Sequence, residues 1–333
     1  MNYHKPLISV IIPNYNHSKY LEQRLESVFN QTYPSFEVIL LDDCSTDTSR
    51  EILTRFAKHE KVSHCIFNTK NTGNTFAQWS KGIALTNGEF IWIAESDDYA
   101  APTFLERVVA PLINDSEVVL SYCQSNHVNE LGIINGNWIT HTQDLDSTMF
   151  LKDFSMDSNV FIERFLICRN VIPNASAVVF KKNAVDIEQH FDMAYEYRYC
   201  GDWMFYIKLI INKKVAFVSD SLNNFRYHDN SVIANVVKTE NRISIIDIEI
   251  KIRKHLMQYL KHNSIINYKA INKKNSLITR KYLTYDKAFL LINSGSKLKG
   301  YLLLLSVFDL FYSNYNFKKN IKVKFKRLFG YLL

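Results

Sequence analysis

Near its start the chain reads Leu7-Ile8-Ser9-Val10-Ile11-Ile12, followed directly by Pro13-Asn14-Tyr15-Asn16. The first six residues are apolar apart from one serine and mostly β-branched, which is typical of a strand buried on both faces of a parallel sheet. The next four are turn-forming residues, which end a strand. This stretch therefore predicts the first strand of an α/β sheet and the loop that follows it.

The same alternation of strand and helix continues through the first 125 residues. Apolar residues at spacings of three and four predict a helix after the first loop, with Ser18 as its N-cap. A second helix is expected to begin at Thr48-x-x-Glu51, which fits a capping box. Further strands are predicted at 36–41, 62–67 and 90–94, and a helix at 76–85. This order indicates a mostly parallel sheet with right-handed crossovers.

The remainder of the chain is patterned differently. Residues 126–235 are less regular, with strands predicted at 175–180 and 215–218 and a helix at 202–211. From about residue 236 the pattern is helical and rich in Ile, Leu, Tyr and Lys.

The net charge of +7 is unevenly distributed along the chain. Residues 238–333 contain 20 Lys and Arg against 5 Asp and Glu, whereas residues 1–237 contain 20 against 28. An acidic body joined to a basic tail suggests two parts with two functions.

Cysteine usage and hydropathy favour a reducing, cytoplasmic setting. The five cysteines are widely spaced and form no C-x-x-C pair, which argues against a disulfide framework and against a zinc site. The short polar start does not look like a signal peptide. No stretch reaches the roughly 18 apolar residues that a transmembrane helix needs.

Two pairs of carboxylates follow predicted strands, Asp42-Asp43 after the second and Asp97-Asp98 after the fourth. Ligands of open α/β sheets bind at the carboxyl ends of the strands. Adjacent carboxylates repel each other unless a cation neutralises them, and Mg²⁺ or Mn²⁺ takes oxygen ligands and bridges to phosphates. Solvated turn aspartates are the alternative for each pair. Two pairs at one edge favour a site for a metal and a diphosphate.

Three stretches resemble glycosyltransferase family 2. They are Ser9-Val10-Ile11-Ile12-Pro13-Asn14-Tyr15-Asn16, Ser27–Asp47 with its Phe36-Glu37-Val38-Ile39-Leu40-Leu41-Asp42-Asp43 core, and Gly88–Asp98, which leads into a D-x-D-type metal motif. The resemblance is dense over 7–110 and loose over 170–230. It implies a GT-A fold and an inverting transfer of one sugar from a nucleotide-sugar donor to an acceptor hydroxyl.

The resemblance also implies a donor site. Pro13 and Tyr15 would border the nucleotide base, and Asp43 would accept a hydrogen bond from it, which suggests uracil and a UDP-linked donor. The loop ending at Asn74, together with Lys81, would lie beside the donor.

The metal would be Mn²⁺ or Mg²⁺. The resemblance puts Asp97 near the ribose and among the candidate metal ligands, and Asp98 on the metal with the diphosphate. Glu95 stands where the family often has Asp, so the ligand set is open. Arg226 could pair with phosphate and His228 could bind the metal; an ordinary surface or core histidine is the alternative.

Inversion needs a base on the acceptor side, and Asp202 is the candidate. It opens a predicted amphipathic helix, so a plain N-cap aspartate is the alternative reading. The family usually shows Glu-Asp here, whereas this chain has Gly201-Asp202.

The acceptor is expected to be a glycan or a lipid-linked sugar in cell-surface polysaccharide or glycolipid assembly, as for capsules and O-antigens. The Q-x-x-R-W motif of processive members is absent, which favours addition of a single sugar.

The basic tail suggests an anionic membrane surface as a partner. Residues 318–329 mix cations with large apolar side chains, and residues 301–312 are strongly apolar. Such segments suit a helix lying in the headgroup region, which would place the protein on the inner face of the plasma membrane. The alternative is a helical cap packed on the catalytic domain. Nucleic acid is not expected, because no recognition motif accompanies the cations.

We therefore expect three parts: residues 1–125 as the nucleotide-sugar-binding half, 126–235 as the acceptor-binding and catalytic half, and 236–333 as a basic helical region. A non-catalytic module that binds a sugar nucleotide is the main rival. A sugar nucleotidyltransferase is a weaker one, because no Gly-rich basic loop follows the first strand.

Overall fold

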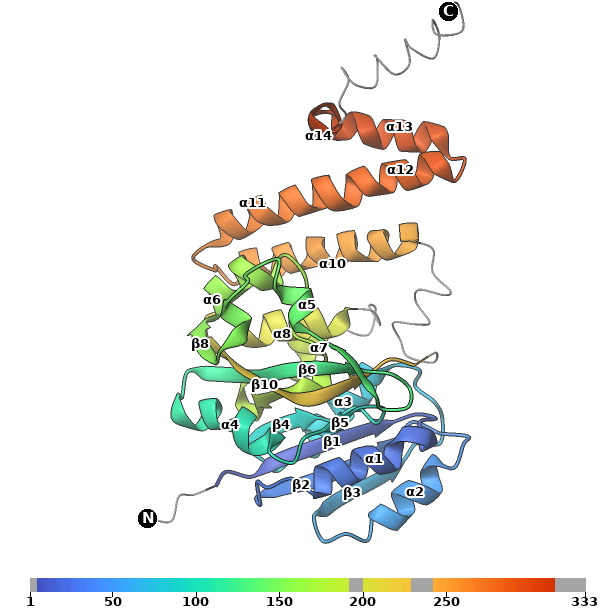
Figure 1. Cartoon of the computed structure of the whole chain (residues 1–333), viewed down its shortest axis with the longest axis vertical. Coiled ribbons are helices and arrows are strands. Elements are labelled where there is room, and N and C mark those ends of the chain that lie inside the picture. Colours follow the sequence, from blue (N-terminus) through green and yellow to red (C-terminus); the bar gives the residue numbers. More distant parts are fainter. Residues whose placement is uncertain (1–4, 192–199, 229–241, 315–333) are drawn as a thin grey trace, which may run out of the picture.

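A computed structural model describes residues 5–191, 200–228 and 242–314, and these form an α/β domain followed by a helical region (Figure 1). The domain is built on a ten-stranded mixed sheet, in which helices lie on both faces. The fold class predicted from the sequence, a GT-A-like α/β arrangement with a C-terminal helical extension, is confirmed.

The strands lie in the order β3-β2-β1-β4-β9-β6-β10-β5, with β7 beside β6 and β8 beside β10. Strands β3, β2, β1 and β4 are parallel, β6 and β10 are parallel, and β9 joins the two groups in antiparallel pairs. The bounds are β1 Ile8–Asn14, β2 Phe36–Asp42, β3 Val62–Phe67, β4 Phe90–Ile93, β5 Tyr99–Ala100, β6 Val118–Val128, β7 Ile134–Asn137, β8 Phe154–Asp157, β9 Val178–Lys181 and β10 Lys214–Arg226.

The position of β1 in the sheet explains why its sequence does not alternate between apolar and polar residues. Val10 and Ile12 belong to one core, while Ile11 belongs to the core on the opposite face. Both faces are covered by helices, so every position of the strand is buried. The helices of the domain are α1 Ser18–Phe29, α2 Ser49–Phe56, α3 Thr75–Ala84, α4 Phe104–Asn114, α5 Ile139–Thr142, α6 Ser158–Phe161, α7 Ile187–Phe191 and α8 Gly201–Ile210, with a π-helical turn at Ile162–Leu166 and 3-10 turns at Met149–Leu151, Ala175–Ala177 and Lys182–Ala184.

Helix starts differ from the sequence predictions in a consistent way. Ser18 is the first residue of α1 rather than its N-cap, which is His17. Thr48 precedes α2 but makes no side-chain cap bond. Asp47 replaces both predicted caps, because its carboxylate accepts hydrogen bonds from the backbone N–H groups of Ser18 and Ser49. One aspartate thus caps two helices, which local sequence patterns do not reveal.

The second half of the domain was predicted least well. Strand β6 was missed, and the expected boundary at residue 125 falls inside it. The strand predicted at 175–180 begins as a 3-10 turn and becomes strand only at Val178. Strand β10 extends well past the predicted 215–218 and reaches Arg226.

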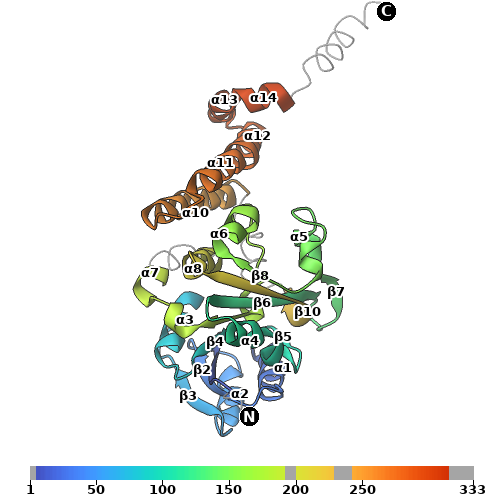
Figure 2. The same cartoon turned by 90° about the vertical axis from the view of Figure 1, so that its left-hand side faces the viewer.

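The helical region stands on one side of the domain and steps away from it (Figures 1 and 2). Its elements are α10 Arg242–His262, α11 Tyr268–Ile278, a π-helical segment Thr279–Thr284, α12 Tyr285–Asn293, α13 Lys297–Ser306 and α14 Phe308–Asn314. Ile252, Leu256 and Leu260 of α10 enter the same core as α8. The helical character expected beyond residue 236 is confirmed for residues 242–314, and the basic segment 318–329 lies outside the described residues.

Candidate active site

The candidate site lies where strands β1, β2 and β4 end. Asn14 and Asp42, the last residues of β1 and β2, are paired in register. The Asn14 amide donates to Asp42 Oδ1 over 3.0 Å, and Arg50 Nε donates to Asp42 Oδ2 over 3.0 Å. The Asp42 carboxylate therefore ties β2 to its neighbours, which leaves Asp43 as the residue of this pair that faces the following loop.

Asp43 organises the loop before α3. Its carboxylate accepts hydrogen bonds from Asn68 Nδ2, Gln78 Nε2 and both the backbone N–H and the hydroxyl of Thr72, at 2.7–3.1 Å. These donors surround a buried carboxylate, so Asp43 holds the loop against the sheet edge in this structure.

The other predicted donor-binding residues lie around that loop or at the end of β1. Lys81 Nζ donates to Asn68 Oδ1 over 2.6 Å, and the Asn74 side chain caps α3 by accepting from Phe76 N. Pro13 is buried within β1, whereas the Tyr15 ring is 43% exposed just beyond it. An exposed aromatic ring beside a hydrogen-bonded loop can stack against the face of a nucleotide base.

Asp97 forms a three-residue cluster with two histidines. Its Oδ2 lies 3.1 Å from His228 Nε2, and one ligand atom each from His17, Asp97 and His228 lie within 4.8 Å of one another. Burial acts to raise the pKa of Asp97, but the two imidazoles outweigh it and lower that pKa. An ionised carboxylate between two imidazoles fits a divalent cation such as Mn²⁺.

Asp98 has a different environment. Its Oδ2 accepts from Asn174 Nδ2 over 2.6 Å, its Oδ1 accepts from the backbone N–H of Arg226, and Arg24 Nη2 lies 3.9 Å away. Burial and the neighbouring Asp97 raise the pKa of Asp98. The carboxylate is 2% exposed, so Asp98 joins buried elements behind the cluster rather than facing an open site.

Arg226 is also directed into the protein. Its guanidinium donates to the carbonyls of Asp97, Asn129 and Glu130 at 2.8–3.3 Å and lies 4.7 Å from the Tyr20 ring. Because the side chain is 2% exposed, this arrangement fixes the 129–130 turn and does not present the cation to a phosphate.

Glu95 is held by α3. Trp79 Nε1 donates to Glu95 Oε1 over 2.7 Å, and burial together with Asp97 raises the pKa of Glu95 to about 8. A carboxyl that is protonated at neutral pH is a weak metal ligand. In this arrangement Glu95 acts as a hydrogen-bonded wall residue.

Asp202 lies in the first turn of α8, as predicted. Its Oδ1 accepts from Trp203 N over 2.8 Å and its Oδ2 accepts from Asn170 Nδ2 over 3.1 Å. Burial raises the pKa of Asp202 to about 6. A carboxylate with this pKa is deprotonated at neutral pH but more basic than an exposed aspartate, as a general base should be.

One short segment connects the metal cluster to the candidate base. Asn170 bonds to Asp202, and Asn174 bonds to Asp98, which adjoins Asp97. The Cα atoms of Asn170 and Asn174, four residues apart, are at most about 14 Å from each other. One short segment thus links the surroundings of the metal cluster to those of the candidate base.

Sequence reasoning missed four members of this arrangement: His17, Arg24, Asn170 and Asn174. His17 directly follows the quoted loop Pro13-Asn14-Tyr15-Asn16, so its place at the sheet edge could have been inferred. Arg24 lies on the apolar face of α1 among Leu21 and Leu25, where a cation signals a buried anion. No local signal distinguishes Asn170.

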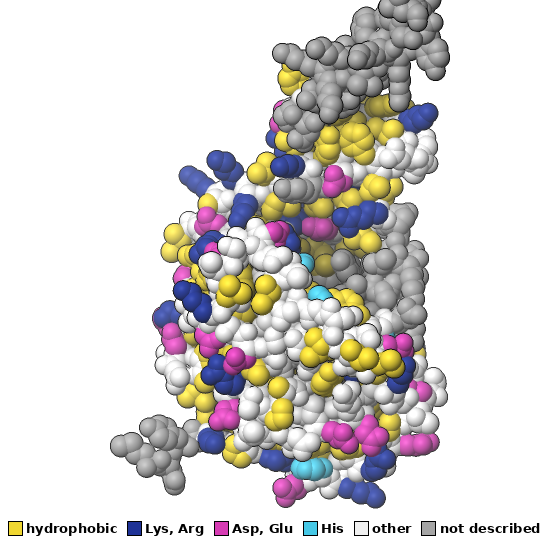
Figure 3. All heavy atoms as spheres, in the orientation of Figure 1, with side chains coloured by type: hydrophobic (Ala, Val, Ile, Leu, Met, Phe, Trp, Pro, Cys, Tyr) yellow, Lys and Arg dark blue, Asp and Glu magenta, His cyan; other side chains and the backbone are white. Residues whose placement is uncertain are grey.

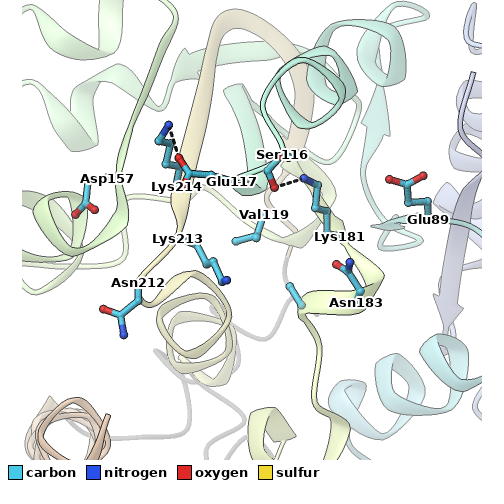
Figure 4. Close-up of a pocket in the computed structure, with 11 residues that line it drawn as sticks. Glu89, Ser116, Glu117, Val119, Asp157, Lys181, Asn183, Asn212, Lys213 and Lys214 are labelled. Atoms are coloured by element: carbon cyan, nitrogen blue, oxygen red, sulfur yellow. Dashed lines mark hydrogen bonds and ion pairs between the residues drawn. The ribbon is translucent and has the colours of Figure 1, made fainter. Parts of the chain in front are cut away.

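A cavity of about 580 Å³ lies at the opposite edge of the sheet, near the starts of β6 and β10 (Figure 4). Lys181 donates there to the Ser116 carbonyl, and Lys214 pairs with Glu117. None of the predicted site residues lines it, so it is separate from the candidate active site.

The sheet order, with carboxylates at the ends of its parallel strands, is that of the GT-A fold. Residues 9–163 match the model described as glycosyl transferase family 2.

Curated relatives agree with this assignment. The chain is 38% identical over 103 residues to the putative teichuronic acid biosynthesis glycosyltransferase TuaG of Bacillus subtilis, an alignment that covers 31% of this chain and 40% of TuaG. The chain thus spans about two fifths of that relative's length. An uncharacterized glycosyltransferase of Haemophilus influenzae is 25% identical over 85% of this chain and 87% of its own length.

Solved structures share the fold. S. aureus TarS 1-349, crystallised with UDP-GlcNAc, matches 78% of this chain and 72% of its own with a TM-score of 0.56 and 19% identity. Mannosyltransferase PcManGT from Pyrobaculum calidifontis, in complex with GDP-Man and Mn²⁺, matches 97% of this chain and 84% of its own with a TM-score of 0.52 and 14% identity.

Proposed function

We propose that the protein is an inverting, non-processive glycosyltransferase that moves one sugar from a UDP-linked donor to an acceptor hydroxyl on a glycan or lipid-linked sugar. The observation that carries the proposal is the 170–174 segment, which bonds at one end to Asp202 and at the other to Asp98, the neighbour of the metal-cluster carboxylate Asp97. An enzyme of this type needs both groups on opposite sides of the reacting carbon.

The donor side uses the first half of the sheet. Tyr15 would stack on the base, and the loop held by Asp43, with Asn74 and Lys81, would lie along the nucleotide. Asp97 and His228 would hold Mn²⁺ or Mg²⁺, with His17 as a further ligand, while Asp98 and Arg226 position them. When bound, the ion supplies positive charge for the departing diphosphate. A carboxylate with two imidazoles favours Mn²⁺ over Mg²⁺, which prefers oxygen ligands.

The acceptor side uses α8. The Asp202 carboxylate would take the proton from the acceptor hydroxyl as that oxygen attacks the anomeric carbon opposite the diphosphate. Attack on that face inverts the anomeric configuration. Asn170 orients the Asp202 carboxylate by donating a hydrogen bond to Oδ2. The remaining lone pairs of the carboxylate can accept the incoming proton.

The first experiment is calorimetric titration with UDP, GDP, CDP and ADP, each with and without Mn²⁺. We expect Mn²⁺-dependent binding of UDP that is lost in Asp97→Ala. Lys58→Ala, an exposed change in the turn after α2, is the matched control and should bind normally. Tight binding of another diphosphate alone would replace UDP in the proposal.

The rival function is a module that binds a sugar nucleotide without catalysis. Release of UDP from UDP-sugars in the presence of a glycan acceptor distinguishes the two. Failure of every nucleotide to bind the folded chain would refute the donor site itself.

We further propose that the helical region rests on an anionic membrane at the inner face of the plasma membrane. Leu298, Leu302, Leu305 and Tyr312 of α13 and α14 are 58–74% exposed, and recur at helical spacing. Hydrophobic and basic side chains gather over these helices (Figure 3). Apolar side chains beside cations favour the headgroup region of anionic lipid. None of the described helices is long and apolar enough to cross a bilayer.

A further inference from the structure

Five aromatic rings form a continuous cluster next to the candidate site. The Trp138 ring lies 5.2 Å from His127, 4.6 Å from His141 and 6.0 Å from Phe225, and Tyr227 lies 5.2 Å from His127. They come from β6, the loop between β7 and α5, α5 itself and the end of β10. Unlike the core rings, these five are half-buried or exposed.

Two polar atoms in this cluster lack partners. The indole Nε1 of Trp138 and the imidazole Nε2 of His127 are shielded from solvent and have no hydrogen-bond partner among the described residues. Buried polar atoms without a hydrogen-bond partner are rare and destabilising, so each requires an explanation. Two of them in adjoining rings point to a ligand that brings hydroxyl groups.

The cluster lies between the two halves of the candidate site. On one side, His141 Nε2 is 3.2 Å from the carbonyl of Asn170, the residue that bonds to Asp202. On the other side, Tyr227 stands between Arg226, whose backbone N–H donates to Asp98, and His228, whose Nε2 lies 3.1 Å from Asp97. A ligand on these rings would therefore lie beside the base.

We propose that this cluster is the acceptor subsite and binds a hexopyranose ring of a glycan. The ring would pack on the Trp138 indole, and its hydroxyls would meet Trp138 Nε1 and His127 Nε2. Aromatic faces with a few placed polar groups are the usual composition of a site for such a ligand. The inference rests on the proposed function, and it narrows the acceptor to a carbohydrate rather than a lipid phosphate.

The four tryptophans make a direct test possible. Trp79, Trp92 and Trp203 are at most 3% exposed, whereas Trp138 is half-buried. In full-length protein labelled with 5-fluorotryptophan, Trp138→Phe assigns the Trp138 ¹⁹F resonance, and the other three report on folding. We expect methyl glycosides of glucose, galactose or N-acetylglucosamine to shift the Trp138 resonance alone, in the presence of UDP and Mn²⁺.

Affinity measurements extend the test. Trp138→Ala should weaken glycoside binding about tenfold, the equivalent of one aromatic contact, while Trp138→Phe retains part of it. Glycerol and cyclohexylmethanol are the controls for a general polyol and a general apolar ligand.

The outcomes separate this inference from the proposed function. UDP binding without any glycoside effect on Trp138 would overturn the acceptor subsite and leave the donor site intact. An equal or larger effect of cyclohexylmethanol would overturn it in favour of an apolar ligand. Glycoside binding without UDP binding would support the subsite and refute the transferase.

Discussion

The α/β domain and the helical region differ in how they treat charge. In the domain, buried charges such as Arg24, Asp42 and Asp98 are matched by partners from distant parts of the chain. In the helical region the buried polar side chains, among described residues 242–314, are Arg253 and Asn275. Large apolar side chains on α13 and α14 are exposed instead.

This difference indicates that the α/β domain holds a site of fixed geometry, whereas the helical region makes a broad surface contact. Buried charged groups are costly unless each is paired, so their presence fixes the geometry around them. Exposed apolar side chains on helices fix no such geometry, but they provide apolar surface for contact with a lipid membrane. Arg253 joins the two regions, because it donates to the carbonyls of Ile167 and Cys168 and lies 5.0 Å from the Trp203 ring.

The largest expected effect is at the base. Asp202→Asn should lower the turnover rate about 10²- to 10⁴-fold, because a general base contributes that much, while UDP binding is unchanged. Steady-state rates and calorimetry measure the two quantities separately. Near-normal turnover would remove Asp202 from the mechanism.

Removal of a buried cation comes next. Arg24→Met should destabilise the protein by about 3–5 kcal/mol, because Asp98 is left buried without its cation. Arg55→Met, which removes an exposed pair with Glu22, is the control and should cost less than about 1 kcal/mol. Urea unfolding measures both, and equal effects would contradict the contrast drawn between buried and exposed charge.

The contact between the α/β domain and the helical region can be disrupted at Arg253. Arg253→Met should destabilise by about 1–3 kcal/mol, since the carbonyls of Ile167 and Cys168 lose their donors. It should also slow turnover, because those carbonyls precede Asn170. Arg280→Met, which removes an exposed pair with Asp309, is the control and should affect neither quantity. An unchanged turnover rate in Arg253→Met would show that the helical region does not influence the candidate active site.

The pH dependence tests the environment of Asp202. Turnover should fall as pH drops below about 6, because the base becomes protonated. The folded-state pKa is raised above that of an unfolded aspartate, so the stabilising contribution of this group is present at low pH and is lost as pH rises through 6. Asp202→Asn should therefore be more stable than the unmodified chain at pH 8, relative to pH 4. Thermal unfolding of both proteins between pH 4 and pH 8 measures this difference, and a difference that does not change with pH would contradict the raised pKa.

The smallest effect on stability is expected at the exposed helices. Leu302→Glu with Leu305→Glu should change unfolding by less than about 0.5 kcal/mol, because both side chains are exposed. Flotation with anionic vesicles should nevertheless decrease strongly, whereas Leu277→Glu, an exposed change on α11, should float normally. Equal flotation of all three proteins would contradict membrane contact.

The sequence by itself determined the first half of the sheet. Each of its early strands is a short apolar run ended by turn residues, and the carboxylates that follow must meet at one edge because parallel strands share their direction. Asp97 could therefore be named as a candidate from the strand pattern, whereas His228 and Asp202 were named from the resemblance to the family that the order of motifs indicated.

Only the tertiary structure decided how the carboxylates divide their work. Asp97 and Asp98 are neighbours in sequence, yet one faces two histidines and the other faces Arg24 and Asn174. Successive residues at a strand end point in different directions, and the partners that each meets come from β1, α1 and the 170–174 segment. The environment of a charge is set by contacts distant in sequence, so its pKa and its role cannot be derived from local pattern alone.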